Sequence, residues 1–355
     1  MKEGWLNRDA PPSQRGKPGP VRAGARQLVD ALRDPENFQT SDWSGLITAA
    51  RAEQLLGSLA FRLEGRPVPE RAASILAGAR REAAQQRTQA LWEAEMARRA
   101  CEGLSVPLIL LKGTAFHAAG LDAAVGRWVG DLDLLVPRAR IEEVEAALID
   151  AGWERIKPAD GYDDLYYRRW MHELPPLVHR DRDRMADVHH TILPPTARPT
   201  PDAAALIADS IAIDSGVAIL SSPDMIVHAA AHLFADGDLA GGLRNLWDID
   251  RLLRQFGAEP GFWQVLATRA RLHQLTAPVA LALRLSARLF ATPVDAGIAG
   301  RARPSDRLFE ARLLARDNWG RPTRPLLRFA FYLRSHWLRM PPLMLARHLL
   351  VKARR

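Results

Sequence analysis

The chain is 355 residues long and 47% hydrophobic, which is enough to bury a sizeable core and to form two or three domains. Its formal charge of +8 favours anionic partners, such as nucleotides, nucleic acid or a membrane surface, without choosing among them. The single cysteine, Cys101, excludes an intramolecular disulfide and fits a reducing cytoplasm. Residues 1–20 lack an apolar core, and no run reaches the roughly 20 apolar residues of a membrane helix. We therefore expect a cytoplasmic protein without a transmembrane segment.

The first 105 residues contain no catalytic pattern. Residues 1–25 are rich in proline, glycine and charge, which predicts a disordered tail. Residues 26–105 form a helical region that we expect to pack as a cap on the next unit. Asp42 is suited to cap a helix whose apolar side chains are Leu46, Ala49, Ala50, Leu55, Leu56 and Leu59. A long helix is expected over residues 70–100.

The most informative stretch is PLILLKGTAFHAAGLDAAVGRWVGDLDLLVP, which predicts a strand, a turn, a helix and a second strand. Residues 106–111 are an apolar run short enough for a buried strand. The strand stops at Lys112-Gly113, where glycine allows a tight turn and a close approach of the backbone to a ligand. Residues 114–120 suit a short helix, and residues 130–136 alternate in polarity as a strand does.

Asp131 and Asp133 are two residues apart on the second strand, so their side chains point to the same face. Adjacent carboxylates repel each other, and burying an unpaired one is costly. A hard divalent cation resolves both problems, because such ions prefer carboxylate oxygens. A solvated strand end is the alternative for this pair taken alone. The glycine turn upstream favours the metal, since it supplies backbone N–H groups for a phosphate.

This constellation resembles the nucleotidyltransferase superfamily, whose fold is shared with DNA polymerase beta. In that superfamily a glycine turn precedes a D-x-D strand, and a third carboxylate comes from a later strand. LLKG, an arginine and GDLDLLVP are more narrowly similar to a bacterial family of uncharacterised nucleotidyltransferases, which has Lys-Gly where most relatives have Gly-Ser. The resemblance covers about residues 43–256. It implies an α+β fold, with a small mixed β-sheet core flanked by N- and C-terminal helical regions.

The nucleotidyltransferase core is expected to span residues 106–195, with a helix at 138–152 and further strands at 165–168, 174–179 and 184–193. In the last strand, period two places Asp187 and His189 on one face. The resembled family carries an Asp-x-His pair at this position. The resemblance therefore implies that Asp187 is the third carboxylate and that His189 lies on the substrate side. An ordinary edge-strand aspartate is the alternative.

Residues 196–300 are expected to be mostly helical, with a helix capped by Ser222 and another at 239–256. His228 and His232 lie on one helical face but lack the glutamate of an H-E-x-x-H zinc motif, so packing explains them better. The resembled family has an aspartate near Asp248, which we treat as a helix-packing or substrate-side candidate.

Residues 301–355 are expected to form a basic helical C-terminal region. No acidic residue follows Asp317, whereas arginines and aromatic residues accumulate after it. This composition predicts either a contact with an anionic lipid or nucleic-acid surface, or a helix whose apolar stripe packs on the body.

The resemblance implies transfer of an NMP from an NTP to an acceptor, with release of pyrophosphate and with two Mg²⁺ ions as cofactors. Asp131 and Asp133 would hold both ions, and Asp187 would complete the ion that activates the acceptor. The candidate nucleotide-binding residues are Lys112, Gly113, Arg127 and Gly130. A solvated strand-end lysine is the alternative for Lys112, and the Lys-Gly pair lacks the hydroxyl that usually meets the phosphate.

Three other classes remain open from the sequence. The first is a nucleotide-binding protein without turnover, and the second is a basic scaffold for nucleic acid or a membrane surface. The third is a zinc hydrolase built on His189, His190, His228 and His232, whose spacing is poor for that purpose. The sequence identifies neither the acceptor nor the preferred base.

Overall fold

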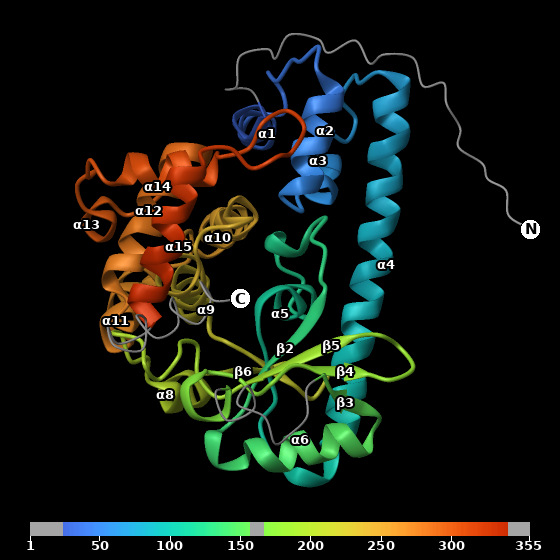
Figure 1. Cartoon of the computed structure of the whole chain (residues 1–355), viewed down its shortest axis with the longest axis vertical. Helices are drawn as coiled ribbons and strands as arrows, with labels where there is room; N and C mark the ends of the chain where they lie inside the picture. The colour runs from blue at the N-terminus through green and yellow to red at the C-terminus, as the bar shows by residue number, and fades with distance from the viewer. Residues whose placement is uncertain (1–23, 157–166, 340–355) are drawn as a thin grey trace, which may run out of the picture.

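A computed structural model of the chain describes residues 24–156 and 167–339. The expected tail at 1–25 therefore lies almost wholly outside the described residues, as do the last basic residues of the chain. The centre of the structure is one seven-stranded mixed sheet in the order β3-β4-β5-β2-β1-β7-β6. Helices flank this sheet on the N- and C-terminal sides (Figure 1), which confirms the predicted α+β class.

The N-terminal part of the chain is helical, as expected. It consists of α1 (Gly24–Arg33), α2 (Trp43–Ala52), α3 (Leu56–Arg62) and α4 (Glu70–Ala100). Asp42 caps α2 by accepting a hydrogen bond from the backbone N–H of Gly45 at 2.8 Å. The single helix expected after Asp42 is wrong, because the chain breaks at Gln54, whose φ of +55° is left-handed. In Figure 1, α4 runs from these helices down to the sheet, where it contacts β2 and α5.

The two strands that the sequence predicted around the glycine turn lie in the same sheet. They are β1 (Ile109–Leu110) and β2 (Asp131–Leu135), paired antiparallel with Ile109 opposite Leu135. Strand β5 (Met185–His189) pairs with β2 in parallel. Strands β3 (Trp153–Arg155) and β4 (Leu177–His179) continue the sheet beyond β5. The prediction that residues 108–111 and 132–136 share one sheet is confirmed.

Several short elements differ from the sequence prediction. Strand β3 was not expected, and β6 (Ile211–Ala212) and β7 (Ala218–Ile219) lie in a region predicted to be mostly helical. Each of these two strands has only two residues. Strand β7 pairs with β1, and β6 pairs with β7. The strand expected at 165–168 is wrong where it is described: residues 167–170 are helical, and 165–166 lie outside the described residues.

The remaining helices pack around the sheet and the N-terminal unit. They are α5 (Lys112–Ala118), α6 (Ile141–Asp150), α8 (Ala203–Ala208), α9 (Ser222–Ala231), α10 (Gly242–Phe256), α11 (Phe262–Leu272), α12 (Thr276–Phe290), α13 (Ala296–Ala299), α14 (Asp306–Leu313) and α15 (Pro325–Arg339). The cap of α9 is Ser221 rather than the expected Ser222, and the Ser221 hydroxyl donates to Asp224 at 3.0 Å.

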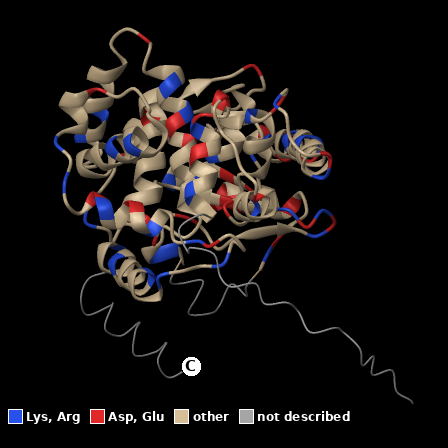
Figure 2. Cartoon of the chain, turned by 90° about the horizontal axis from the view of Figure 1, so that it is seen from above, with Lys and Arg blue, Asp and Glu red and all other residues tan. Residues whose placement is uncertain are grey.

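The basic C-terminal region packs partly on the body of the protein. Phe331 of α15 is buried, and Arg334 donates to the carbonyl of Phe234 at 2.8 Å. Basic and acidic residues are interspersed along the described part of the chain in Figure 2. Contact of this region with an anionic surface therefore stays a prediction. Within the described ranges, no helix is long and apolar enough to cross a membrane.

Candidate functional site

Three carboxylates converge where β2 lies beside β5. The parallel register places Asp133 directly opposite Asp187, and Asp131 lies two residues before Asp133 on the same face. One oxygen from each of the three aspartates lies within 4.8 Å of the others. Three carboxylate oxygens at this spacing form a donor set suited to a hard divalent cation. The sequence predicted all three residues, and the strand register brings them together.

Asp133 is the best-satisfied carboxylate of the three. It is 2% exposed, and its Oδ1 accepts hydrogen bonds from Lys112 Nζ at 2.6 Å and from His189 Nε2 at 3.1 Å. Burial raises the pKa of Asp133, but the positive Lys112 and the bonded His189 outweigh it and hold the pKa well below its usual value. Asp133 is thus ionised at neutral pH, and the Lys112 ammonium is its counterion. The alternative of a solvated strand-end lysine is wrong, because this side chain is ion-paired.

Asp187 is the least satisfied carboxylate. Its Oδ1 is buried and has no hydrogen-bond partner among the described residues. Burial, together with the nearby charges of Asp133 and Glu173, raises the pKa of Asp187 to about 7. An unpaired oxygen that faces two other carboxylates is the position at which a cation would relieve the greatest electrostatic cost. The site therefore fits Mg²⁺ by its donor atoms as well as by their spacing.

His189 links this site to two residues that the sequence did not single out. Its Nδ1 lies 3.5 Å from Glu173 Oε2, and the same oxygen lies 3.7 Å from His172 Nε2. Glu173 is held in place by a backbone bridge to His189. No motif spacing could have identified this pair, because it depends on how the chain enters β4 beside β5. The carboxylate of Glu173 thus lies beside one ring nitrogen of His189, while the other ring nitrogen is hydrogen-bonded to Asp133 at 3.1 Å.

Arg127 and Asp248 form a buried ion pair beneath the site. Arg127 is 5% exposed, and its Nε donates to Asp248 Oδ2 at 3.0 Å. A Cβ atom on Gly113 would overlap the Arg127 guanidinium, so the absence of a side chain at Gly113 makes room for this pair. This arrangement makes Arg127 and Asp248 positioning groups for the segment before β2. Gly130 lies under the Trp128 ring, where a Cβ would approach Cη2 to 2.6 Å.

Gly113→Ala is expected to destabilise the protein by about 3 kcal/mol or more, because the added methyl group forces the guanidinium away from a buried carboxylate. Urea denaturation measures this change in the free energy of unfolding. Gly103→Ala is the matched control, since no atom lies within 4 Å of the position of its added Cβ. Equal stability of the two variants would contradict the role assigned to Gly113.

The remaining histidines do not form a metal site in the described part of the chain. His228 is buried, and burial lowers the pKa of His232 to about 3, so His232 is neutral and packed. Both residues line a small cavity of about 30 Å³ beside Lys112. His190 bonds to the carbonyl of Met171 at 3.2 Å. None of these three belongs to a group with metal-ligand spacing there, whereas His172, Glu173 and His189 do form one.

Comparison with known families agrees with this geometry. A family model described as an uncharacterised nucleotidyltransferase matches residues 39–291, which is more than half of the chain. The matched range contains the three aspartates, Lys112 and the His189 network. The resemblance drawn from LLKG and GDLDLLVP is thereby confirmed. No curated protein sequence matches the chain.

Proposed function

Because the chain belongs to the uncharacterised nucleotidyltransferase family, we propose that it transfers an NMP from an NTP to an acceptor in a Mg²⁺-dependent reaction. Pyrophosphate leaves as the phosphorus–oxygen bond to the acceptor forms. The observation that carries the proposal is the convergence of Asp131, Asp133 and Asp187 within 4.8 Å. The proposed acceptor is a small molecule or macromolecule that bears a nucleophilic hydroxyl group.

In this proposal, Asp131 and Asp133 would hold two Mg²⁺ ions, and Asp187 would complete the ligand set on the acceptor side. When bound, Mg²⁺ would supply positive charge for the attacking and leaving oxygens. Asp187 is also proposed to accept the proton of the acceptor hydroxyl, because it is the carboxylate on the acceptor side. His189 keeps Asp133 oriented through its 3.1 Å hydrogen bond.

Lys112 is proposed as the residue that neutralises the triphosphate. Its side chain is 24% exposed and lies at the start of α5, next to Gly113. The neighbouring carboxylates outweigh burial and raise the pKa of Lys112, so it keeps its proton at neutral pH. An ammonium that is charged and partly accessible can exchange a carboxylate partner for a phosphate.

The direct test is to supply each of the four NTPs with Mg²⁺ and to measure pyrophosphate release with and without a cell extract as the acceptor source. We expect Mg²⁺-dependent release that EDTA abolishes, and a labelled NMP attached to an extract component. NTP binding without any release would instead identify a nucleotide-binding protein without turnover. Hydrolysis that depends on Zn²⁺ rather than Mg²⁺ would overturn the proposal.

A further inference from the structure

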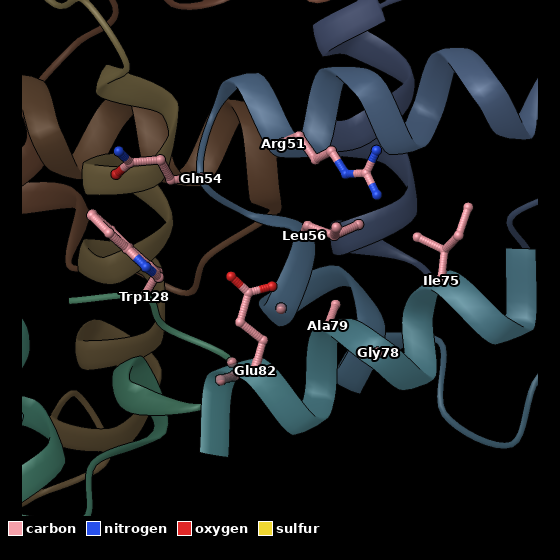
Figure 3. Close-up of a pocket in the computed structure, with 11 residues that line it drawn as sticks. Arg51, Gln54, Leu56, Ile75, Gly78, Ala79, Glu82 and Trp128 are labelled. Carbon is pink, nitrogen blue, oxygen red and sulfur yellow. The ribbon is translucent and has the colours of Figure 1, made fainter. Parts of the chain in front are cut away.

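A pocket of about 610 Å³ lies between the N-terminal helices and the segment that leads into β2. Its walls come from the end of α2 and the turn after it, the start of α3, the first half of α4 and the segment around Trp128 (Figure 3). The volume falls in the range of small-molecule sites in proteins. The apolar part of the lining includes Leu56, Ile75 and Ala79, and Gly57, Gly78 and Gly126 contribute backbone alone. Such a lining leaves flat surfaces inside the pocket.

Four polar side chains around this pocket have no partner among the described residues. Arg51 comes from the last turn of α2, Gln54 from the turn that follows it, Glu82 from α4 and Trp128 from the segment before β2. No hydrogen bond or ion pair joins any of these side chains to another described residue. In Figure 3 the Glu82 carboxylate extends into the space between Trp128 and Leu56. Free donors and acceptors beside flat apolar surfaces suit a planar ligand with a polar edge.

Gln54 follows the end of α2 and lines the pocket. Its φ of +55° is left-handed, and the N–H of Leu55 donates to the carbonyl of Ala50 at 2.8 Å, as at an ordinary left-handed helix ending. The end of α2 thus fixes where Gln54 meets the rim of the pocket.

The pocket is fixed beside the three carboxylates. Trp128 precedes Asp131 by three residues, so their Cα atoms are at most about 11 Å apart. A Cβ on Gly126 would overlap the backbone of Gly57, which shows that α3 and this segment pack backbone against backbone. Ser58 adds a hydrogen bond to the carbonyl of Val125 at 3.1 Å. The packing of the N-terminal helices therefore fixes the position of the pocket relative to β2.

The carbonyl of Trp128 is also held from the opposite side. Arg244 of α10 donates to this carbonyl at 3.0 Å, and Arg127 is paired with Asp248 of the same helix. The backbone of Trp128 is thus held in place, and the residue is 39% exposed. A rigid, accessible aromatic ring next to the candidate metal ligands is a suitable surface for stacking.

We propose that this pocket binds the nucleobase of the donor NTP, an inference that rests on the proposed function. The base stacks on Trp128, and the ribose spans the short distance to the phosphorus at Asp131. Glu82 accepts a hydrogen bond from an exocyclic amino group of the base, since a carboxylate can only accept. The pocket thus favours adenine, cytosine or guanine over uracil, which has no such group.

The test is calorimetric binding of non-hydrolysable α,β-methylene NTP analogues, with Mg²⁺, to the full chain. Trp128→Leu is expected to raise the Kd roughly tenfold or more by removing the stacking surface. Trp128→Phe keeps an aromatic face and should recover most of the affinity. Glu82→Gln should raise the Kd for the amino-bearing analogues by roughly tenfold, because a neutral amide oxygen is a weaker acceptor than a carboxylate, while the UTP analogue should bind no more weakly than before.

Trp319→Leu and Glu259→Gln are the matched controls, because both side chains are exposed and neither lines the pocket. Both should bind the analogues as the unmodified protein does, and melting temperatures establish that each variant is folded. Unchanged affinity in folded Trp128→Leu and Glu82→Gln would overturn the nucleobase assignment and leave the proposed function standing. Failure of the unmodified protein to bind any of the analogues would overturn both.

Discussion

Asp131→Asn and Asp133→Asn are each expected to abolish Mg²⁺-dependent nucleotidyl transfer. Each substitution keeps the shape of the side chain and removes a charge that holds the ions. Losing a single preorganised electrostatic group already costs on the order of 10²–10³ in rate, and losing a metal ion should cost more. The measurement is the rate of pyrophosphate release at saturating Mg²⁺ and NTP.

The same two variants should differ in stability. From the sequence alone, relief of repulsion between the carboxylates would make both at least as stable as the unmodified protein. Burial raises the pKa of Asp131, so that expectation still holds for Asp131→Asn. Asp133 is bonded to Lys112 and His189, and its lowered pKa means that its charge stabilises the fold above about pH 4. Asp133→Asn should therefore lower the melting temperature at pH 7, and the loss should vanish in acid.

Two controls complete this experiment. Asp150→Asn changes an exposed aspartate at the end of α6 and should leave activity and stability unchanged. His228→Ala should show a packing cost with activity largely kept, because His228 is buried outside the carboxylate group. If Asp133→Asn stayed active while folded His228→Ala was inactive, the histidines rather than the aspartates would form the site.

Mg²⁺ is expected to bind more tightly as the pH rises through about 7, because Asp187 must lose its proton to become a ligand. The raised pKa of Asp187 also makes the free energy of unfolding depend on pH. A carboxyl group whose pKa rises from 3.8 to about 7 on folding favours the folded state only while it is protonated. Its contribution is present below about pH 4 and is lost as the pH rises to 7. At about 1.4 kcal/mol per pKa unit, the loss is at most about 4 kcal/mol.

Asp187→Asn should consequently melt at a higher temperature than the unmodified protein at pH 8 without metal, and at a similar temperature at pH 4. Adding Mg²⁺ at pH 8 should raise the melting temperature of the unmodified protein more than that of the variant, which keeps Asp131 and Asp133 but has lost one ligand. Thermal denaturation at both pH values, with and without Mg²⁺, measures all of these changes. An equal Mg²⁺ effect in the two proteins would remove Asp187 from the metal site.

The central part of the site could be predicted because it depends on local rules. Alternation within β2 places Asp131 and Asp133 on one face, and the motif order of the resembled family points to Asp187. The pair of Arg127 and Asp248 could not be predicted, since 121 residues separate its members in the chain. The Lys-Gly turn is visible in the sequence, but the need for glycine at position 113 follows from the distant pair of Arg127 and Asp248, because the Arg127 guanidinium fills the space beside it.

Other parts of the fold have too little sequence signal of their own. Strands β6 and β7 have two residues each, which is too short for any periodicity to distinguish them from a loop. They form because the backbone of β7 pairs with the side of β1 that faces away from β2. The sequence likewise could not assign Glu173 and His172 to the site, because they join it only through their contacts with His189 of β5.

Because Lys112 is ion-paired with Asp133, the Lys112 ammonium serves as a counterion that can leave this carboxylate. The ammonium lies 2.6 Å from Asp133 Oδ1 and neutralises a carboxylate that, in the proposed function, would also bind Mg²⁺. A metal arriving alone must displace that charge and leave it unpaired. A metal arriving with a triphosphate gives the lysine a new anionic partner at the same moment. Free Mg²⁺ and free NTP should therefore each bind more weakly than the two together, a positive coupling built into one side chain.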